Sequence, residues 1–76
     1  MNETEQAILA VLDANNGRTS WDTVKAGLTY PQVQQMPIAI KSLKKQGIAQ
    51  AQNRVVNGRP VFEVFRIGAP LPPAGS

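Results

Sequence analysis

The chain has 76 residues, enough for one domain with a small core, because a chain of this length buries about 60% of the surface that its unfolded form exposes. It contains no cysteine and no histidine, which excludes a disulfide framework and the usual zinc ligand sets. The formal net charge of +3 favours an acidic partner, and no metal or cofactor is expected.

The charge is distributed unevenly along the chain. Residues 1–28 carry four acidic and two basic side chains, whereas residues 41–66 carry six basic side chains and one acid, Glu63. The positive charge therefore belongs to the second half. The first residues are acidic and polar and lack the pattern of a secretory signal, and no apolar run is long enough to span a bilayer. A soluble, cytoplasmic protein without membrane contact is expected.

A first helix is predicted over residues 2–15. Asn2 stands three residues before Glu5, a spacing at which the two side chains satisfy free backbone amides at a helix start. Apolar residues then recur at helical spacing, and the run of Asn15, Asn16 and Gly17 ends the helix, because both residue types tolerate a left-handed backbone.

The next segment, residues 18–20, is too short for a regular strand of its own, but it can add a brief edge to a sheet formed elsewhere. Ser20 is the expected cap of a short second helix over residues 21–28. Trp21 begins that helix and is expected to pack in the core. Pro31 then restricts the residue before it to an extended backbone, which breaks the pattern.

A third helix is indicated by an apolar stripe that contains Met36, Ile40 and Leu43. Because proline is tolerated in the first helical turn and costs about 3 kcal/mol in the interior, Pro37 places the expected start of the regular helix between residues 34 and 36. Gly47 ends it.

Two strands joined at Asn57 and Gly58 are predicted between residues 48 and 67, since that dipeptide suits a type I′ turn with positive φ at both residues. The turn predicts that Arg54 pairs with Val61, Gln52 with Glu63, and Ile48 with Ile67. Side chains alternate along a strand, so Phe62 is expected to be partly exposed if Phe65 is in the core. The Pro- and Gly-rich tail, residues 68–76, is predicted to be disordered.

This order of elements resembles the winged helix-turn-helix family. The junction from Ile40 to Gly47 and Ile48, with its basic run, is similar to the family's passage from recognition helix into wing, and Phe65 followed by Ile67 resembles the end of its second wing strand. The resemblance implies an α+β fold, a three-helix winged helix-turn-helix with a C-terminal β-hairpin wing, over residues 2–67. Pro37 departs from the family, whose recognition helix is normally uninterrupted.

In that family the third helix enters the DNA major groove. The resemblance therefore implies a reading surface on this helix, formed by Gln34, Gln35, Ile38, Lys41, Ser42 and Lys45. Glutamine can bind adenine, an apolar side chain can touch a thymine methyl, and lysine can bind phosphate or guanine. Ile38 would be an aliphatic residue in the middle of this surface. The same residues are also what the solvated side of an amphipathic helix contains.

The wing is expected to lie along the backbone or minor groove, through Arg54, Asn57 and Arg59. The turn requires Asn57 and Gly58 for their φ angles whatever the wing touches. Together these surfaces suggest a small transcriptional regulator that binds double-stranded DNA. A homodimer is compatible with this function. No small-molecule substrate is evident from the sequence.

Other functions stay open. A protein-interaction module of the same fold would use Ile38 and an exposed Phe62, and a single-strand binder would depend on Tyr30 and the basic wing. An enzyme is not expected, because the chain has no histidine or cysteine and no phosphate loop. The acids Asp13, Asp22 and Glu63 are predicted to be surface charges.

Overall fold

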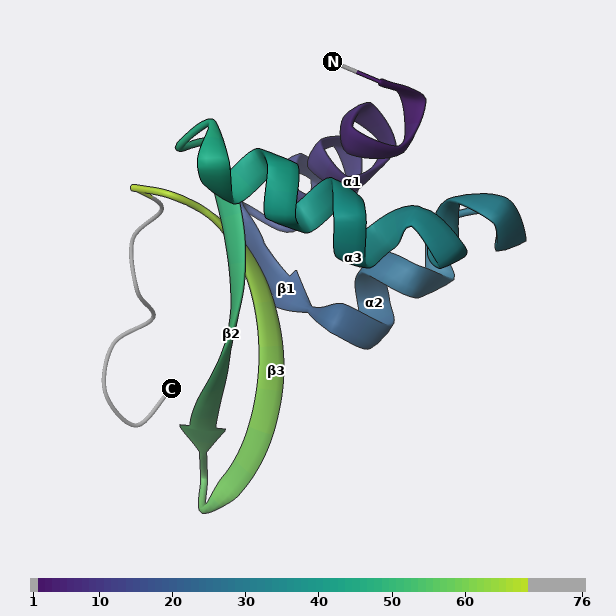
Figure 1. The fold of residues 1–76 in the computed structure, drawn as a ribbon. Helices are drawn as coiled ribbons and strands as arrows, with labels where there is room; N and C mark the ends of the chain where they lie inside the picture. The colour runs from purple at the N-terminus through teal and green to yellow at the C-terminus, as the bar shows by residue number, and fades with distance from the viewer. Residues whose placement is uncertain (1, 69–76) are drawn as a thin grey trace.

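The computed structural model describes residues 2–68, which fold into three helices and one sheet (Figure 1). The elements follow in the order α1 (Glu3–Ala14), β1 (Arg18–Ser20), α2 (Trp21–Ala26), α3 (Tyr30–Lys45), β2 (Ala49–Val56) and β3 (Arg59–Arg66). The strands form an antiparallel sheet in the order β1-β3-β2. The mixed α+β class is confirmed, but the sheet is larger than a C-terminal hairpin, because β1 pairs with β3.

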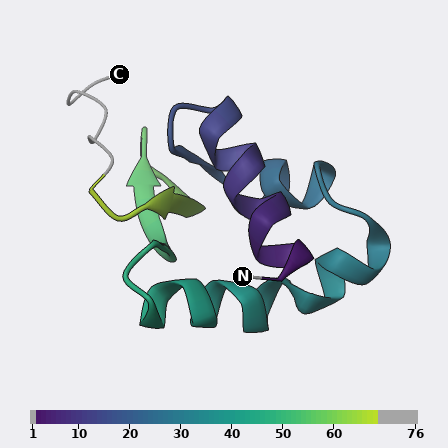
Figure 2. The ribbon, with the colours of Figure 1, turned by 90° about the horizontal axis from the view of Figure 1, so that it is seen from above.

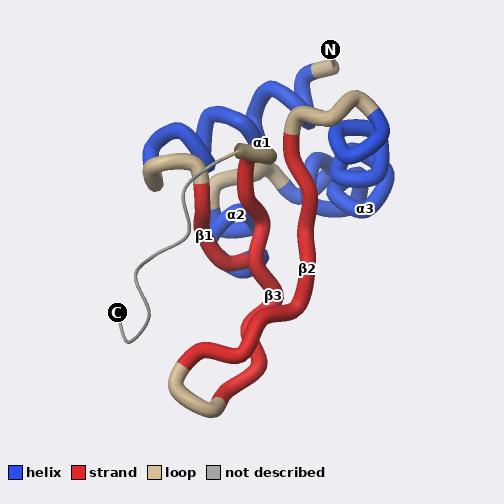
Figure 3. Tube along the Cα trace, turned by 90° about the vertical axis from the view of Figure 1, so that its left-hand side faces the viewer, coloured by secondary structure: helices blue, strands red, loops and turns tan. Residues whose placement is uncertain are grey.

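The arrangement places the sheet beside the helices. Viewed from above, the strands stand next to the C-terminal end of α3 (Figure 2). The hairpin formed by β2 and β3 extends beyond the helices as a twisted ribbon (Figure 3). Within residues 2–68, no helix is long and apolar enough to cross a membrane. Of the tail that was predicted to be disordered, residues 68–76, Gly68 is described and lies in a turn, and residues 69–76 lie outside the described residues.

The ends of α1 agree with the prediction. The Glu5 backbone N–H donates to Asn2 Oδ1 at 2.8 Å, and the Asn2 N–H donates to Glu5 Oε1 at 3.4 Å, which completes the capping box. At the other end, Asn16 has φ 60° and the Gly17 N–H donates to the Leu12 carbonyl at 2.7 Å. The same carbonyl also accepts from the Asn15 N–H at 2.9 Å, so it closes the helix end, and the left-handed Asn16 turns the chain into β1.

The predicted start of α3 was wrong. The helix begins at Tyr30 and continues through Pro37 to Lys45. Thr29 and Gln32 form a second capping box, in which the Thr29 N–H donates to Gln32 Oε1 at 2.9 Å, and Pro31 falls in the first turn, where its missing N–H has no cost. This start signal outweighs the backbone hydrogen bond that Pro37 removes.

The hairpin has the predicted turn and register. Asn57 and Gly58 have φ 53° and 77°, as a type I′ turn requires, and the pairs of Arg54 with Val61 and Gln52 with Glu63 are both present. The Ile67 N–H donates to the Ile48 carbonyl at 3.0 Å, so the third predicted pair is also confirmed.

The core lies where α1 and α3 meet the inner side of the sheet. The small Ala49 of β2 is buried there, and the largest fully buried side chains come from every helix and from β3: Ile8, Leu12, Val24, Met36, Leu43 and Val64. The stripe predicted for the third helix is therefore the inward side of α3. At its end, Gly47 has φ 76° and the Ile48 N–H donates to the Leu43 carbonyl at 2.9 Å, so the chain passes directly from core helix to β2.

An exposed ion pair joins the end of α1 to the end of β3. Arg66 Nε donates to Asp13 Oδ1 at 2.7 Å, and Arg66 Nη2 donates to Asp13 Oδ2 at 3.0 Å. The hydrogen bonds from Arg66 hold the pKa of Asp13 below its ordinary value of 3.8 and raise the pKa of Arg66. Asp13 is a surface charge, as predicted, and it lies in the last turn of α1, where Arg66 offsets an unfavourable contact with the helix dipole.

The pair makes a pH dependence testable. Because the folded pKa of Asp13 lies below 3.8, its stabilising effect is present above that pH and is lost as the pH falls through the folded value. We expect Arg66→Gln to raise the pKa of Asp13 toward 3.8 in an NMR titration of the carboxyl group. Arg59→Gln, at the far end of the hairpin, is the control and should leave the midpoint in place. An unchanged Asp13 midpoint in Arg66→Gln would show that the hydrogen bonds do not cause the shift.

Candidate nucleic-acid interface

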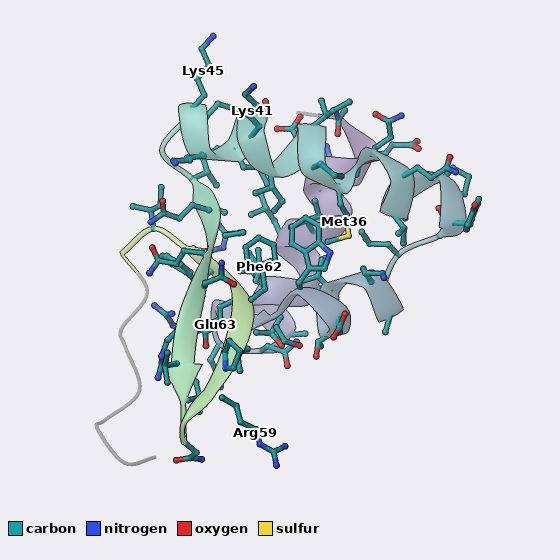
Figure 4. All side chains as sticks on the ribbon, turned by 60° about the horizontal axis from the view of Figure 1, so that its bottom comes forward. Met36, Lys41, Lys45, Arg59, Phe62 and Glu63 are labelled. Carbon is teal, nitrogen blue, oxygen red and sulfur yellow. The ribbon has the colours of Figure 1, made fainter. Side chains whose placement is uncertain are left out.

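The outer side of α3 carries most of the predicted reading surface. The exposed side chains are Gln34, Gln35, Ile38, Lys41 and Lys45. Ile38 is 67% exposed and lies among polar neighbours. Lys41 and Lys45 extend from the helix away from the body of the protein (Figure 4). The helix therefore presents amide, aliphatic and ammonium groups together on its outer side.

Ser42 does not belong to this surface. Its hydroxyl donates to Glu5 Oε2 at 3.5 Å, and Gln46 Nε2 donates to the same oxygen at 3.0 Å. Glu5 is 5% exposed, so this network lies in the contact between α1 and α3. Helical spacing places Ser42 about 40° from Ile38, at the edge of the outer side. The hydrogen bond to Glu5 turns the Ser42 side chain toward α1 and away from the outer side.

The tip of the hairpin is a second exposed site. Asn57 and Arg59 are both exposed, and Arg59 lies far from Lys41 and Lys45 (Figure 4). Among the described residues Arg59 has no ion-pair partner, and the same holds for the three lysines of α3. The predicted site residues thus form two separate basic surfaces, one on the helix and one at the tip.

Arg54 is engaged inside the protein. Its Nη1 lies 3.4 Å from Glu63 Oε2, and Arg18 Nη1 lies 2.6 Å from Glu63 Oε1. The side chains of Arg18 and Glu63 are 10% and 12% exposed, and that of Arg54 is 25% exposed. Any contact of Arg54 with a phosphate would compete with this carboxylate.

The same cluster corrects the prediction that Glu63 is a surface charge. Val64 points into the core, so the alternation along β3 directs Glu63 and Phe65 to the opposite side of the sheet. There β1 brings Arg18 beside Glu63, and the Arg18 guanidinium lies 4.4 Å from the centre of the Phe65 ring. Arg18 Nε is buried and has no hydrogen-bond partner. We refer to Arg18, Glu63 and Arg54 as the sheet ion cluster.

A groove opens between α3 and the hairpin. Its volume is about 430 Å³, and it is lined by Trp21, Pro37, Ile40, Lys41, Lys44, Ala51 and Phe62. The rings of Trp21 and Phe62 are 5.0 Å apart between centroids and tilted by 38°. Phe62 is 41% exposed and Phe65 is 7% exposed, which confirms the prediction for this pair, while Trp21 is half-buried against the core.

Sequence reasoning missed this groove because its lining comes from α2, α3, β2 and β3. The signal available in the sequence was Phe62, because strand alternation places it and Phe65 on opposite sides of β3. In the structure Phe62 lies on the same side as the core residue Val64 and meets Trp21 at the edge of the core. Within the described residues, no three histidine, cysteine or acidic side chains are grouped to hold a metal ion.

Comparisons of this chain with protein-family models, with curated proteins and with solved structures find no match.

The sheet ion cluster leads to a stability prediction. Glu63→Gln leaves two largely buried guanidinium groups without their counter-charge, so we expect the free energy of unfolding to fall by about 3 kcal/mol in urea denaturation. Asp22→Asn removes an exposed acid that has no ion pair among residues 2–68, and it should change the free energy of unfolding by less than about 0.5 kcal/mol. Equal stability of the two variants would contradict a structural role for the cluster.

Proposed function

We propose that the chain is a small DNA-binding protein of the winged helix-turn-helix type, a transcriptional regulator. In this proposal α3 enters the major groove of double-stranded DNA and the β2-β3 hairpin contacts the adjacent backbone or minor groove. The element order and the sheet order β1-β3-β2 are compatible with that family's architecture. A homodimer would double the contacts of a module this small.

One observation carries the proposal, namely the cations that are left without an internal partner. Three arginines are neutralised within the protein: Arg18 and Arg54 by Glu63, and Arg66 by Asp13. The three lysines of α3 and Arg59 of the hairpin tip have no such partner in the described part of the chain. Unpaired cations on a helix and an adjacent hairpin suit the phosphates on either side of a groove.

The other side chains on α3 fit the reading of bases. Gln34 and Gln35 can donate and accept hydrogen bonds at an adenine edge, and Ile38 can contact a thymine methyl. In this proposal Ser42 and Arg54 are removed from the set of contacts, because Glu5 and Glu63 hold them. The expected contacts are therefore Gln34, Gln35, Ile38, Lys41 and Lys45 on α3, with Asn57 and Arg59 at the tip.

Exposed aromatic rings favour a second candidate function, the binding of single-stranded nucleic acid. Tyr30 is 75% exposed at the start of α3, and Phe62 is partly exposed in the groove. Bases stack on such rings without sequence preference. Parallel titrations with a duplex and with each of its single strands separate the two candidates, since preference for the single strand would favour the second.

The duplex hypothesis predicts the effect of removing one cation from each basic surface. Lys41→Ala combined with Arg59→Ala should weaken binding to a fluorescent duplex and lower the slope of log affinity against log salt by about 1.8, or about 0.9 for each lost phosphate contact. The matched control is Lys25→Ala, which removes an exposed lysine from α2. Equal effects in the control and the double variant would reduce the interaction to net charge and contradict the proposed interface.

A further inference from the structure

The groove between α3 and the hairpin differs from the basic surfaces on either side of it. Five of its seven lining residues are apolar, and the other two are lysines of α3. The tilted ring pair of Trp21 and Phe62 is part of this lining. Ile40 and Ala51 form the part of the lining that continues into the core. The groove is therefore an opening onto the apolar interior and not a feature of the charged surface.

Pro37, together with Ile40, gives the helical wall of the groove its apolar character. It lies inside α3 and lines the groove, although proline in a helix interior costs about 3 kcal/mol. Its ring lies in the lining that Phe62 completes from β3. Aromatic rings and proline together form a surface that favours flat or narrow apolar groups.

The charges of the groove have one sign. Lys41 and Lys44 are three residues apart on α3, so their side chains lie on the same part of the helix surface. Neither has an ion-pair partner among residues 2–68, and no acidic side chain is part of the described lining. Charge complementarity therefore selects an occupant with an apolar body and a negative end.

We propose that this groove binds a small organic carboxylate, in which an aromatic ring or short hydrocarbon chain lies between Pro37 and Phe62 and the carboxylate is held by Lys41 and Lys44. The volume of about 430 Å³ falls in the range of small-molecule sites, which are mostly apolar with a few charged groups that orient the ligand. A nucleobase fits less well, because its polar edges need hydrogen bonds and the described lining residues supply no side-chain amide or hydroxyl.

A ligand in the groove would affect DNA binding, an inference that rests on the proposed function. Lys41 belongs both to the groove and to the proposed DNA contact of α3. A bound carboxylate would neutralise it and lower the affinity for a duplex, so the ligand and DNA would compete. The groove would then be an effector site beside the DNA-binding surface.

Trp21 makes binding directly observable, because it is the single tryptophan of the chain and it lines the groove. We expect phenylbutyrate to change its fluorescence saturably. Phenylbutanol, the neutral analogue, should bind about two- to fivefold more weakly, as the loss of an exposed ionic contact predicts, and acetate should produce no saturable change. Equal affinity for the alcohol, or no saturation by phenylbutyrate, would overturn the proposal, as would tighter binding of thymidine monophosphate.

Two adjacent lysines supply the matched variants. Lys44→Gln should weaken phenylbutyrate binding about two- to fivefold, whereas Lys45→Gln should leave it unchanged, because Lys45 does not line the groove. Both lysines are exposed, so neither substitution is expected to affect folding, and a thermal melt checks this. Equal effects of the two substitutions would point to general attraction of anions and would overturn the site.

Competition is measured separately from binding. Phenylbutyrate should displace a fluorescent duplex from the wild-type protein, and phenylbutanol at the same concentration should displace less. If the protein binds no duplex, the proposed function fails, while the Trp21 titration still decides the groove. If it binds duplex and phenylbutyrate saturates the groove without displacement, the carboxylate site stands and its link to DNA binding is overturned.

Discussion

The carboxylate of Glu63 is the interaction on which the sheet depends. It lies on the central strand and receives an arginine from each neighbour, Arg18 from β1 and Arg54 from β2. Two guanidinium groups on one carboxylate leave the cluster with a net positive charge, so the carboxylate is needed to hold them at low exposure. A segment of three residues, β1, becomes part of the sheet through this cluster and its backbone pairing with β3.

The position of Glu63 also determines what lies on the other side of β3. Because side chains alternate, a carboxylate held on the outer side directs Phe62 and Val64 toward the helices. Val64 completes the core, and Phe62 reaches Trp21 at the edge of it. A shift of the register by one residue would move the carboxylate inward and remove Phe62 from the groove. The ion cluster and the groove are therefore two results of one register.

The parts of the fold that sequence predicts well are those that depend on near neighbours. The capping box that begins α1 and the turn at Asn57 and Gly58 involve residues within three positions of each other, and both are present. The start of α3 was also locally encoded, by Thr29 and Gln32, but the weight given to Pro37 concealed it. The site is harder to predict because Arg18 and Glu63 are 45 residues apart, and only the pairing of β1 with β3 brings them together.

The net charge of the chain is only +3, but the internal contacts of the acidic side chains leave positive charge concentrated on particular surfaces. Glu5, Asp13 and Glu63 each bind a partner within the fold, and two of them neutralise arginines. The cations without an ion-pair partner in the described part of the chain are lysines of α2 and α3 and the arginine of the hairpin tip. Positive charge is spread along the second half of the sequence. In the folded protein, most of the arginines there are paired with acids, whereas the lysines have no ion pair among the described residues. Lys41 stands where the outer side of α3 meets the groove, so two kinds of anion, a phosphate and an organic carboxylate, would depend on the same ammonium group.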